Sequence, residues 1–199
     1  MAEGSESWFE PLRQALSARP RTVIRDAPVF TVPPTSAAVL VPLFERAGEH
    51  YLVLTRRTES VREHKGQISF PGGARDPRDV TLLETALRET EEELGIDPAM
   101  VKILGVLDDY LTVTNYQITP FVGAIPPDCT YHPHADEVAE VLEVPLRFLA
   151  DPARHRRELW EWEGSPREVY HLDAGSCVIW GATARIVLQL LATWNTLGG

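Results

Sequence analysis

The residues of this chain best suited to chemistry form an acidic run at positions 89–93. Glu89, Glu92 and Glu93 stand three and four residues apart, so a helix carries them on a shared side. Like charges at these spacings cost roughly 0.2–0.5 kcal/mol per pair, and a helix C-terminus also disfavours anions. A divalent cation, Mg²⁺ or Mn²⁺, would relieve this repulsion, because hard cations take carboxylate oxygens and often bridge to substrate phosphates. The run therefore predicts a metal site, with a solvated acidic helix face as the alternative.

The sequence around the acidic run resembles the Nudix box. That pattern is Gly, five residues, Glu, seven residues, then Arg-Glu-x-x-Glu-Glu-x-Gly and an apolar residue. Residues 88–96 match its second half without a gap. The first half departs. Asp79, which five residues separate from Gly73, stands where the pattern has Glu, and eight residues rather than seven separate Asp79 from Arg88. The sequence therefore does not decide which residue, if any, takes the part of the first glutamate of the motif.

A second stretch, residues 54–73, resembles the additional motif of the coenzyme A pyrophosphatase branch of Nudix hydrolases. It reads LTRRT, three residues, Arg62, three residues, Gly66, three residues and FPGG. Thr58 replaces the Ser that is usual in this motif, which is a mild change.

Two further parts of the chain are similar to the same branch. One is LDDY at 107–110 together with TPFVG at 119–123, and the other is IWGATAR at 179–185. The resemblance thus covers about residues 36–191, which is most of the chain.

The resemblance implies a metal-dependent hydrolase that cleaves coenzyme A or its thioesters to 3′,5′-ADP and (acyl-)4′-phosphopantetheine. It implies Glu92 and Glu93 as metal ligands, Glu89 as a further ligand or the base, and Arg88 as a partner that fixes the motif carboxylates. Two alternatives stay open. One is a Nudix hydrolase of another nucleoside diphosphate derivative, such as ADP-ribose or a dinucleotide. The other is a non-catalytic Nudix domain used for binding.

Residues outside the acidic run complete the predicted site. Many Nudix enzymes draw a further carboxylate from elsewhere, and Glu137 is the first candidate, with Glu140 as the second. Gly72 and Gly73 are predicted to let backbone amides approach the metal or phosphate, with a plain tight turn as the alternative. The predicted catalytic residues are Arg88, Glu89, Glu92, Glu93 and Glu137.

Basic residues cluster beside this loop in an otherwise acidic chain. Arg is suited to two-bond contacts with phosphate, and coenzyme A carries a 3′-phosphate besides its central diphosphate. Part of the cluster is therefore predicted to bind that phosphate, with a purely structural role as the alternative. The cluster consists of Arg56, Arg57, Arg62, His64 and Lys65.

Composition places limits on the partners. The 199 residues suit one domain, and their net charge of −10 disfavours nucleic acids and anionic membranes as partners. No stretch approaches the ~18 apolar residues of a membrane span, and the N-terminus lacks the features of a signal peptide. The two cysteines form no metal-ligand spacing or disulfide framework. A cytoplasmic enzyme acting on a small molecule is expected, and the oligomeric state is open, a homodimer included.

The pattern of elements predicts an α/β protein, which the resemblance sharpens to a Nudix fold, a mixed β-sheet between α-helices. Residues 1–35 are expected to form a helix and connector packed on a Nudix domain spanning 36–199. Thr81 and Glu84 fit a capping box at the start of the acidic helix. Helices are predicted at 8–16, 82–94 and 182–197, and strands at 37–44, 51–55, 101–107, 118–125 and 137–144. Residues 56–72 are predicted to form an irregular loop. Residues 158–172 are predicted to form a polar hairpin, in which Trp160 and Trp162 are packing residues rather than an adenine platform.

Overall fold

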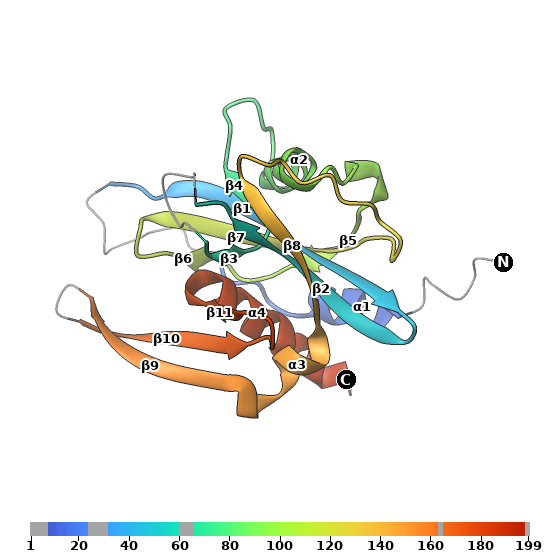
Figure 1. Ribbon diagram of the computed structural model, residues 1–199. Helices are drawn as coiled ribbons and strands as arrows, with labels where there is room; N and C mark the ends of the chain where they lie inside the picture. The colour runs from blue at the N-terminus through green and yellow to red at the C-terminus, as the bar shows by residue number, and fades with distance from the viewer. Residues whose placement is uncertain (1–7, 24–31, 60–65, 163–164, 198–199) are drawn as a thin grey trace.

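The computed structural model describes residues 8–23, 32–59, 66–162 and 165–197. Within them, a mixed sheet of eight strands lies between helices, and a three-stranded antiparallel sheet packs below it (Figure 1). The helices are α1 (Glu10–Ala18), α2 (Leu82–Leu94), α3 (Leu146–Ala150) and α4 (Gly181–Trp194). The strands are β1 (Thr35–Arg46), β2 (Glu49–Arg57), β3 (Ile68–Ser69), β4 (Gly72–Ala74), β5 (Lys102–Val106), β6 (Tyr110–Leu111), β7 (Tyr116–Ala124), β8 (Val138–Pro145), β9 (His155–Trp162), β10 (Ser165–Asp173) and β11 (Val178–Trp180).

The large sheet is organised around β1. The strand order is β3-β2-β1-β7-β5, with β4 also paired to β1, β6 to β7 and β8 to β2. Strands β1 and β7 run parallel over nine residue pairs, from Thr35 opposite Tyr116 to Leu43 opposite Ala124, whereas the other pairs are antiparallel. The predicted mixed sheet is therefore confirmed, and β8 is the strand that alternation at 137–144 favoured.

Helix α2 has the ends that its sequence predicts. The Thr81 hydroxyl accepts a hydrogen bond from the Glu84 backbone N–H, and the Glu84 carboxylate accepts one from the Thr81 backbone N–H. Gly95 ends the helix with a left-handed φ of 69°, a conformation that glycine adopts at little cost. These local contacts fix where the acidic helix begins and stops.

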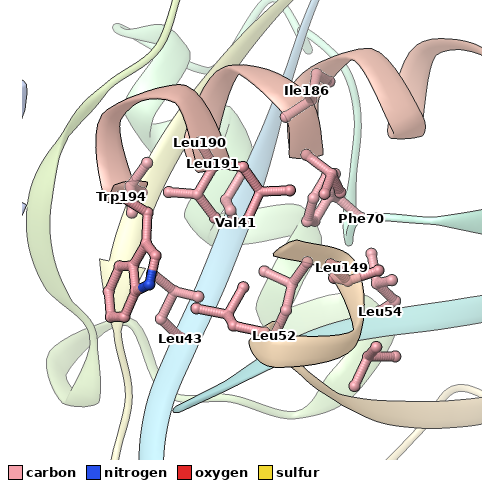
Figure 2. Close-up of a cluster of buried hydrophobic side chains, with 14 of the residues drawn as sticks. Val41, Leu43, Leu52, Leu54, Phe70, Leu149, Ile186, Leu190, Leu191 and Trp194 are labelled. Atoms are coloured by element: carbon pink, nitrogen blue, oxygen red, sulfur yellow. The ribbon is translucent and has the colours of Figure 1, made fainter. Parts of the chain in front are cut away.

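Both faces of the large sheet are covered. Side chains alternate along β2, so Leu52 and Leu54 enter the core beneath α4, while Val53 packs with Leu94 of α2 on the opposite face. Figure 2 shows the α4 side chains Ile186, Leu190, Leu191 and Trp194 gathered with Val41, Leu43, Leu52, Leu54, Phe70 and Leu149. Phe70 lies two residues before β4, so the core beneath α4 anchors the segment that leads into β4.

Helix α1 shares this core. Phe9, Leu12 and Leu16 are buried in the same cluster as the α4 residues, and α1 contacts both β5 and α4. The helix begins two residues later than predicted, at Glu10. The division into residues 1–35 and 36–199 stays a prediction. None of the helices in the described parts of the chain is long and apolar enough to span a membrane.

The prediction of an irregular loop at 56–72 was wrong in three places. Strand β2 continues to Arg57, and β3 and β4 occupy parts of the segment. Each of the two short strands is held by pairing, β3 to β2 and β4 to β1. Their few residues carry no periodic pattern of their own, so only the partner strand defines them.

The predicted hairpin is present as β9 and β10. Trp160 packs partly on β11, with its ring 6.0 Å from that of Trp180 and 6.3 Å from that of His171. Trp160 is 45% exposed and Trp162 is 41% exposed, so neither is buried, and among the described residues only Trp160 of the two makes ring contacts.

Candidate active site

Glu93 is the most unusual side chain of α2. Its side chain is only 5% exposed, and its Oε1 lies 3.8 Å from the Arg57 guanidinium. Its Oε2 is buried and has no hydrogen-bond partner among the described residues. Burial raises the pKa of Glu93 to about 8, against the opposing charge of Arg57 and a hydrogen bond from the Gly72 backbone N–H. A buried carboxylate with a free oxygen is a costly arrangement unless a proton or a cation occupies it.

Gly72 and Gly73, the first two residues of β4, allow this strand to lie close to both β1 and α2. Gly72 has φ +149°, and a Cβ there would lie 2.4 Å from the Ala38 carbonyl oxygen of β1. A Cβ on Gly73 would lie 2.5 Å from Oε2 of Glu89. Only glycine therefore lets β4 pass between β1 and the carboxylates of α2. The two glycines therefore lie in a strand and not in the plain tight turn that was the alternative, and the Gly72 backbone N–H donates to the Glu93 carboxylate.

Glu89 and Glu137 lie within electrostatic range of Glu93. Burial raises the pKa of Glu89, the adjacent Arg88 guanidinium opposes this shift, and the charges of Glu92 and Glu137 add to it. Glu137 likewise contributes to raising the pKa of Glu93. It is exposed and directly precedes β8, so the structure places a carboxylate from outside α2 within electrostatic range of the site. Glu140 instead pairs with Arg56 at 2.9 Å.

A network centred on Arg88 holds the acidic helix to the preceding loop. Its Nε and Nη2 donate to the two carboxylate oxygens of Asp79, each at 3.0 Å. Its Nη1 lies 2.9 Å from a carboxylate oxygen of Glu89 and 2.9 Å from one of Glu92. The expected pairing of Arg88 with motif carboxylates is thus present.

Asp79 is a site residue whose role the sequence left open. It is buried and also accepts hydrogen bonds from the Thr85 hydroxyl, at 2.9 Å, and from the Asp76 backbone N–H, at 3.0 Å. The Arg88 guanidinium holds the pKa of Asp79 well below its ordinary value. The acidic residue at the shifted spacing therefore does reach the motif arginine. The Asp at the altered spacing was the one sign in the sequence of this role. The contact itself joins residues nine positions apart, Asp79 in the loop before α2 and Arg88 within α2, so the sequence alone did not predict it.

The three glutamates do not share one environment, contrary to the expectation that they project together. Glu93 is buried, Glu89 is half-buried with a side chain 18% exposed, and Glu92 is 59% exposed and paired to Arg88. The three residues lie at different angles around the axis of α2. Glu93 lies on the same buried side of the helix as Thr90 and Leu94. The structure brings Glu89 and Glu93 to the glycines of β4 and leaves Glu92 on the solvent side.

The predicted substrate cations divide between the two faces of the sheet. Arg57 points to α2 and Glu93, whereas its neighbour Arg56 binds Glu140, as alternation along β2 requires. Arg62, His64 and Lys65 lie outside the described residues. The two members of the cluster that the structure describes are each paired with a carboxylate, Arg56 with Glu140 and Arg57 with Glu93.

Comparison with known proteins decides the family. Residues 34–162 match the NUDIX domain. The chain belongs to the Nudix family. It is 43% identical over 154 residues to a Cronobacter sakazakii protein described as the uncharacterized Nudix hydrolase NudL, covering 77% of this chain and 80% of that protein. A protein of Enterobacter sp. strain 638 with the same description is 42% identical over the same shares.

Solved structures support the Nudix fold. A NUDIX hydrolase from Alicyclobacillus acidocaldarius superposes with a TM-score of 0.57 at 18% identity, over 82% of this chain and 93% of that one. A MutT/nudix family protein from Enterococcus faecalis gives a TM-score of 0.53 at 16% identity, over 87% and 65% of the two chains. At these identities the likeness concerns the fold alone.

The Nudix carboxylates suit a hard divalent cation, the kind of ion that Nudix hydrolases generally use. Among the described residues, no three His, Cys, Asp or Glu side chains form a ready-made metal cage. The free buried oxygen of Glu93, with Glu89 beside it and Glu137 within electrostatic range, nevertheless offers donors of the right type. Mg²⁺ is commonly held by one or two carboxylates together with waters and substrate phosphates. An open acidic site fits this mode of binding.

Proposed function

We propose that this Nudix hydrolase is a cytoplasmic coenzyme A diphosphatase. It cleaves coenzyme A or its acyl thioesters, with Mg²⁺ or Mn²⁺, to 3′,5′-ADP and (acyl-)4′-phosphopantetheine. The observation that carries the diphosphatase chemistry is the buried carboxylate of Glu93, whose Oε2 is left without a hydrogen-bond partner among the described residues.

The choice of coenzyme A rests on residues 54–73, which resemble the coenzyme A pyrophosphatase motif. This stretch supplies two of the contacts of Glu93, the guanidinium of Arg57 and the backbone N–H of Gly72. The residues that distinguish this branch of the family are therefore in direct contact with the proposed catalytic carboxylate. This proximity supports a link between the motif and the reaction.

Each residue has a proposed part in the hydrolysis. A bound divalent cation neutralises phosphate charge and lowers the pKa of coordinated water. Glu89 and Glu93 would hold it, with Glu92 as the ligand on the solvent side and Glu89 or Glu137 as the base. Arg88 fixes Glu89 and Glu92 through its contacts at 2.9 Å. Carboxylates that are already fixed in position favour catalysis because they need no reorganisation during the reaction.

A product assay tests the proposal. The enzyme is incubated with Mg²⁺ or Mn²⁺ and coenzyme A, dephospho-coenzyme A, ADP-ribose or NADH, and the products are separated by chromatography. We expect 3′,5′-ADP from coenzyme A at the highest kcat/KM, with Glu93→Gln as the inactive control. A higher kcat/KM for ADP-ribose or NADH would favour a hydrolase of another nucleoside diphosphate derivative. No turnover of any substrate would favour a binding domain.

A further inference from the structure

Strand β9 is an open edge of the three-stranded sheet. The strand order is β11-β10-β9, and β10 is the only described strand that pairs with β9. In Figure 1, β10 lies between β9 and α4, so the outer side of β9 faces away from the rest of the molecule. The backbone N–H and C=O groups along that outer side are therefore open to pairing with another strand.

The edge is long and regular. Proteins often block an edge strand with proline, lysine, a β-bulge or very short length. Strand β9 reads HRRELWEW over eight residues, and it pairs with β10 in one continuous register, from His155 opposite Leu172 to Trp162 opposite Ser165. Its charges are of both signs, so the order of charges in a second strand decides whether that strand is repelled or attracted.

Three large apolar side chains of β9 are exposed to solvent. Leu159 is 70% exposed, Trp160 is 45% exposed and Trp162 is 41% exposed. Because side chains alternate along a strand, Leu159 lies on one face of the small sheet and the two tryptophans lie on the other. A layer packed on one face would cover only one of these groups. A strand added beside β9 contacts both faces of the edge, so it is the arrangement that suits this distribution.

The charges of β9 are self-complementary about Leu159. Arg157 and Glu161 lie two positions before and two positions after it, on the same face. If β9 pairs antiparallel with β9 of a second copy, with Leu159 opposite Leu159, each Arg157 lies opposite a Glu161. Among the described residues, Glu161 has no ion pair within its own subunit. Arg157 pairs with Glu168 at 2.8 Å but is 62% exposed, and a guanidinium has five N–H groups to share.

The other face of the same pairing is also complementary. Each Arg156 would lie opposite Trp162, and a guanidinium over an indole ring is a favourable contact. Each Glu158 would lie opposite Trp160, whose indole N–H already donates to the Glu158 carboxylate of its own strand at 2.9 Å. Both faces therefore offer attractive pairs in this one arrangement.

Neighbouring arrangements are less favourable. A two-fold axis between antiparallel strands places one residue opposite its own copy, so the register can move only in whole-residue steps of this central position. An axis at Glu158 would place two carboxylates opposite each other, and an axis at Trp160 would place Leu159 opposite Glu161. Leu159 is therefore the central position that the sequence of β9 favours.

We propose that β9 pairs antiparallel with β9 of a second copy of this chain, with Leu159 at the two-fold axis, to form a homodimer. The pairing joins two three-stranded sheets into one continuous sheet and leaves neither copy of β9 as an open edge. This surface is separate from the candidate active site on α2, β2 and β4, so the inference holds for any substrate. Because a single strand pair makes a small interface, we expect dissociation constants of about 1–100 μM.

Sedimentation velocity of the full-length protein tests the dimer over roughly that concentration range. The wild-type protein should show a concentration-dependent equilibrium of monomer and dimer. Leu159→Lys should weaken association at least about tenfold, because it places two like charges opposite each other at the axis. Val178→Lys is the matched control, since Val178 is 50% exposed on β11, at the other edge of the same sheet, and it should leave the equilibrium unchanged. Circular dichroism verifies that both variants are folded.

A mixing experiment tests the register. Glu161→Lys and Arg157→Glu should each stay largely monomeric, because each opposes like charges twice in a homodimer. An equimolar mixture of the two variants should form heterodimers, since every charge then meets its opposite. Any loss of the internal contact between Arg157 and Glu168 is the same in the mixture, so recovered association reports the pairing between subunits.

Three results would overturn the inference. The first is a wild-type protein that is monomeric over the whole range, which would leave β9 open to an extended segment of a different protein. The second is a dimer that Leu159→Lys leaves intact or that Val178→Lys weakens equally. The third is a mixture of Glu161→Lys and Arg157→Glu that forms no heterodimer.

Discussion

The guanidinium of Arg88 donates two hydrogen bonds to the carboxylate of Asp79, from Nε to Oδ1 and from Nη2 to Oδ2, each at 3.0 Å. Such a two-bond contact fixes orientation as well as distance. Because the third nitrogen of Arg88 contacts Glu89 and Glu92, the loop before α2 sets the position of the acidic residues on α2. Asp79 is therefore a positioning residue for the proposed metal site.

Asp79→Asn should weaken Mg²⁺ binding and lower the rate by roughly tenfold to a hundredfold, the usual effect of losing an outer partner of a metal ligand. The amide keeps one acceptor for Arg88 but loses the paired geometry. Metal titration of the hydrolysis rate measures the effect, and Asp79→Glu should recover part of it. Asp128→Asn, at an exposed position between β7 and β8, serves as the control. Unchanged metal dependence in Asp79→Asn would remove Asp79 from the positioning network.

Glu93→Gln should reduce kcat by at least about a hundredfold, since several kcal/mol of charge stabilisation by the metal would be lost and each 1.4 kcal/mol is tenfold. The fold should survive, because the amide removes a buried charge and not a packing group. Circular dichroism and thermal unfolding in a chelator check this point. Near-normal kcat at saturating Mg²⁺ would contradict the assignment of Glu93 as a ligand.

Gly73→Ala should displace the Glu89 carboxylate, because the new methyl group would start 2.5 Å from its Oε2. We expect weaker metal affinity and a lower rate with little loss of thermal stability. A double-variant cycle with Glu89→Ala isolates this contact, since the two changes should not add if the methyl acts through Glu89. Full additivity of the two losses would place the effect of Gly73→Ala elsewhere.

His50 predicts a pH dependence of folding. Its ring lies between those of Trp8 and Trp194, at 5.0 and 4.7 Å, and burial lowers its pKa, with the charges of Glu45 and Glu49 opposing the shift. Because the unfolded chain binds this proton more readily, stability should be lost as the pH falls below the ordinary histidine pKa of 6.5. The slope should not exceed about 1.4 kcal/mol per pH unit.

Urea unfolding at several values between about pH 5.5 and pH 7.5 measures that slope. His50→Gln should flatten it, whereas His134→Gln, at an exposed position, should leave it in place. An equally steep slope in His50→Gln would assign the effect to other groups.

Features governed by neighbouring residues were predictable from the sequence. The ends of α2 follow from Thr81, Glu84 and Gly95, whose capping contacts involve residues within a turn of one another. Strand β8 follows from alternation of apolar residues along eight positions. In each case the chemistry that sets the element lies within the element itself.

Features governed by distant partners were not predictable in the same way. The predicted strand ended at Thr55, so the sequence did not indicate that Arg56 and Arg57 lie on opposite faces of the sheet. The extension of β2 to Arg57 depends on its pairing with β8. The pairing of Asp79 with Arg88 depends on how the loop folds back over α2. Similarly, the burial of Glu93 depends on β4, which is held in place by its pairing with β1.

The hydrogen bond from the Thr183 hydroxyl of α4 to the Ile68 carbonyl oxygen of β3 has a consequence for dissecting this protein. The Nudix match ends at residue 162, yet α4 begins at Gly181 and packs with Phe70, which lies two residues before β4. A fragment that ends at residue 162 would keep every acidic residue of the motif but would lose α4, against which Phe70 packs. We therefore expect the smallest catalytically competent fragment to extend through α4, and a fragment designed to keep activity should include that helix.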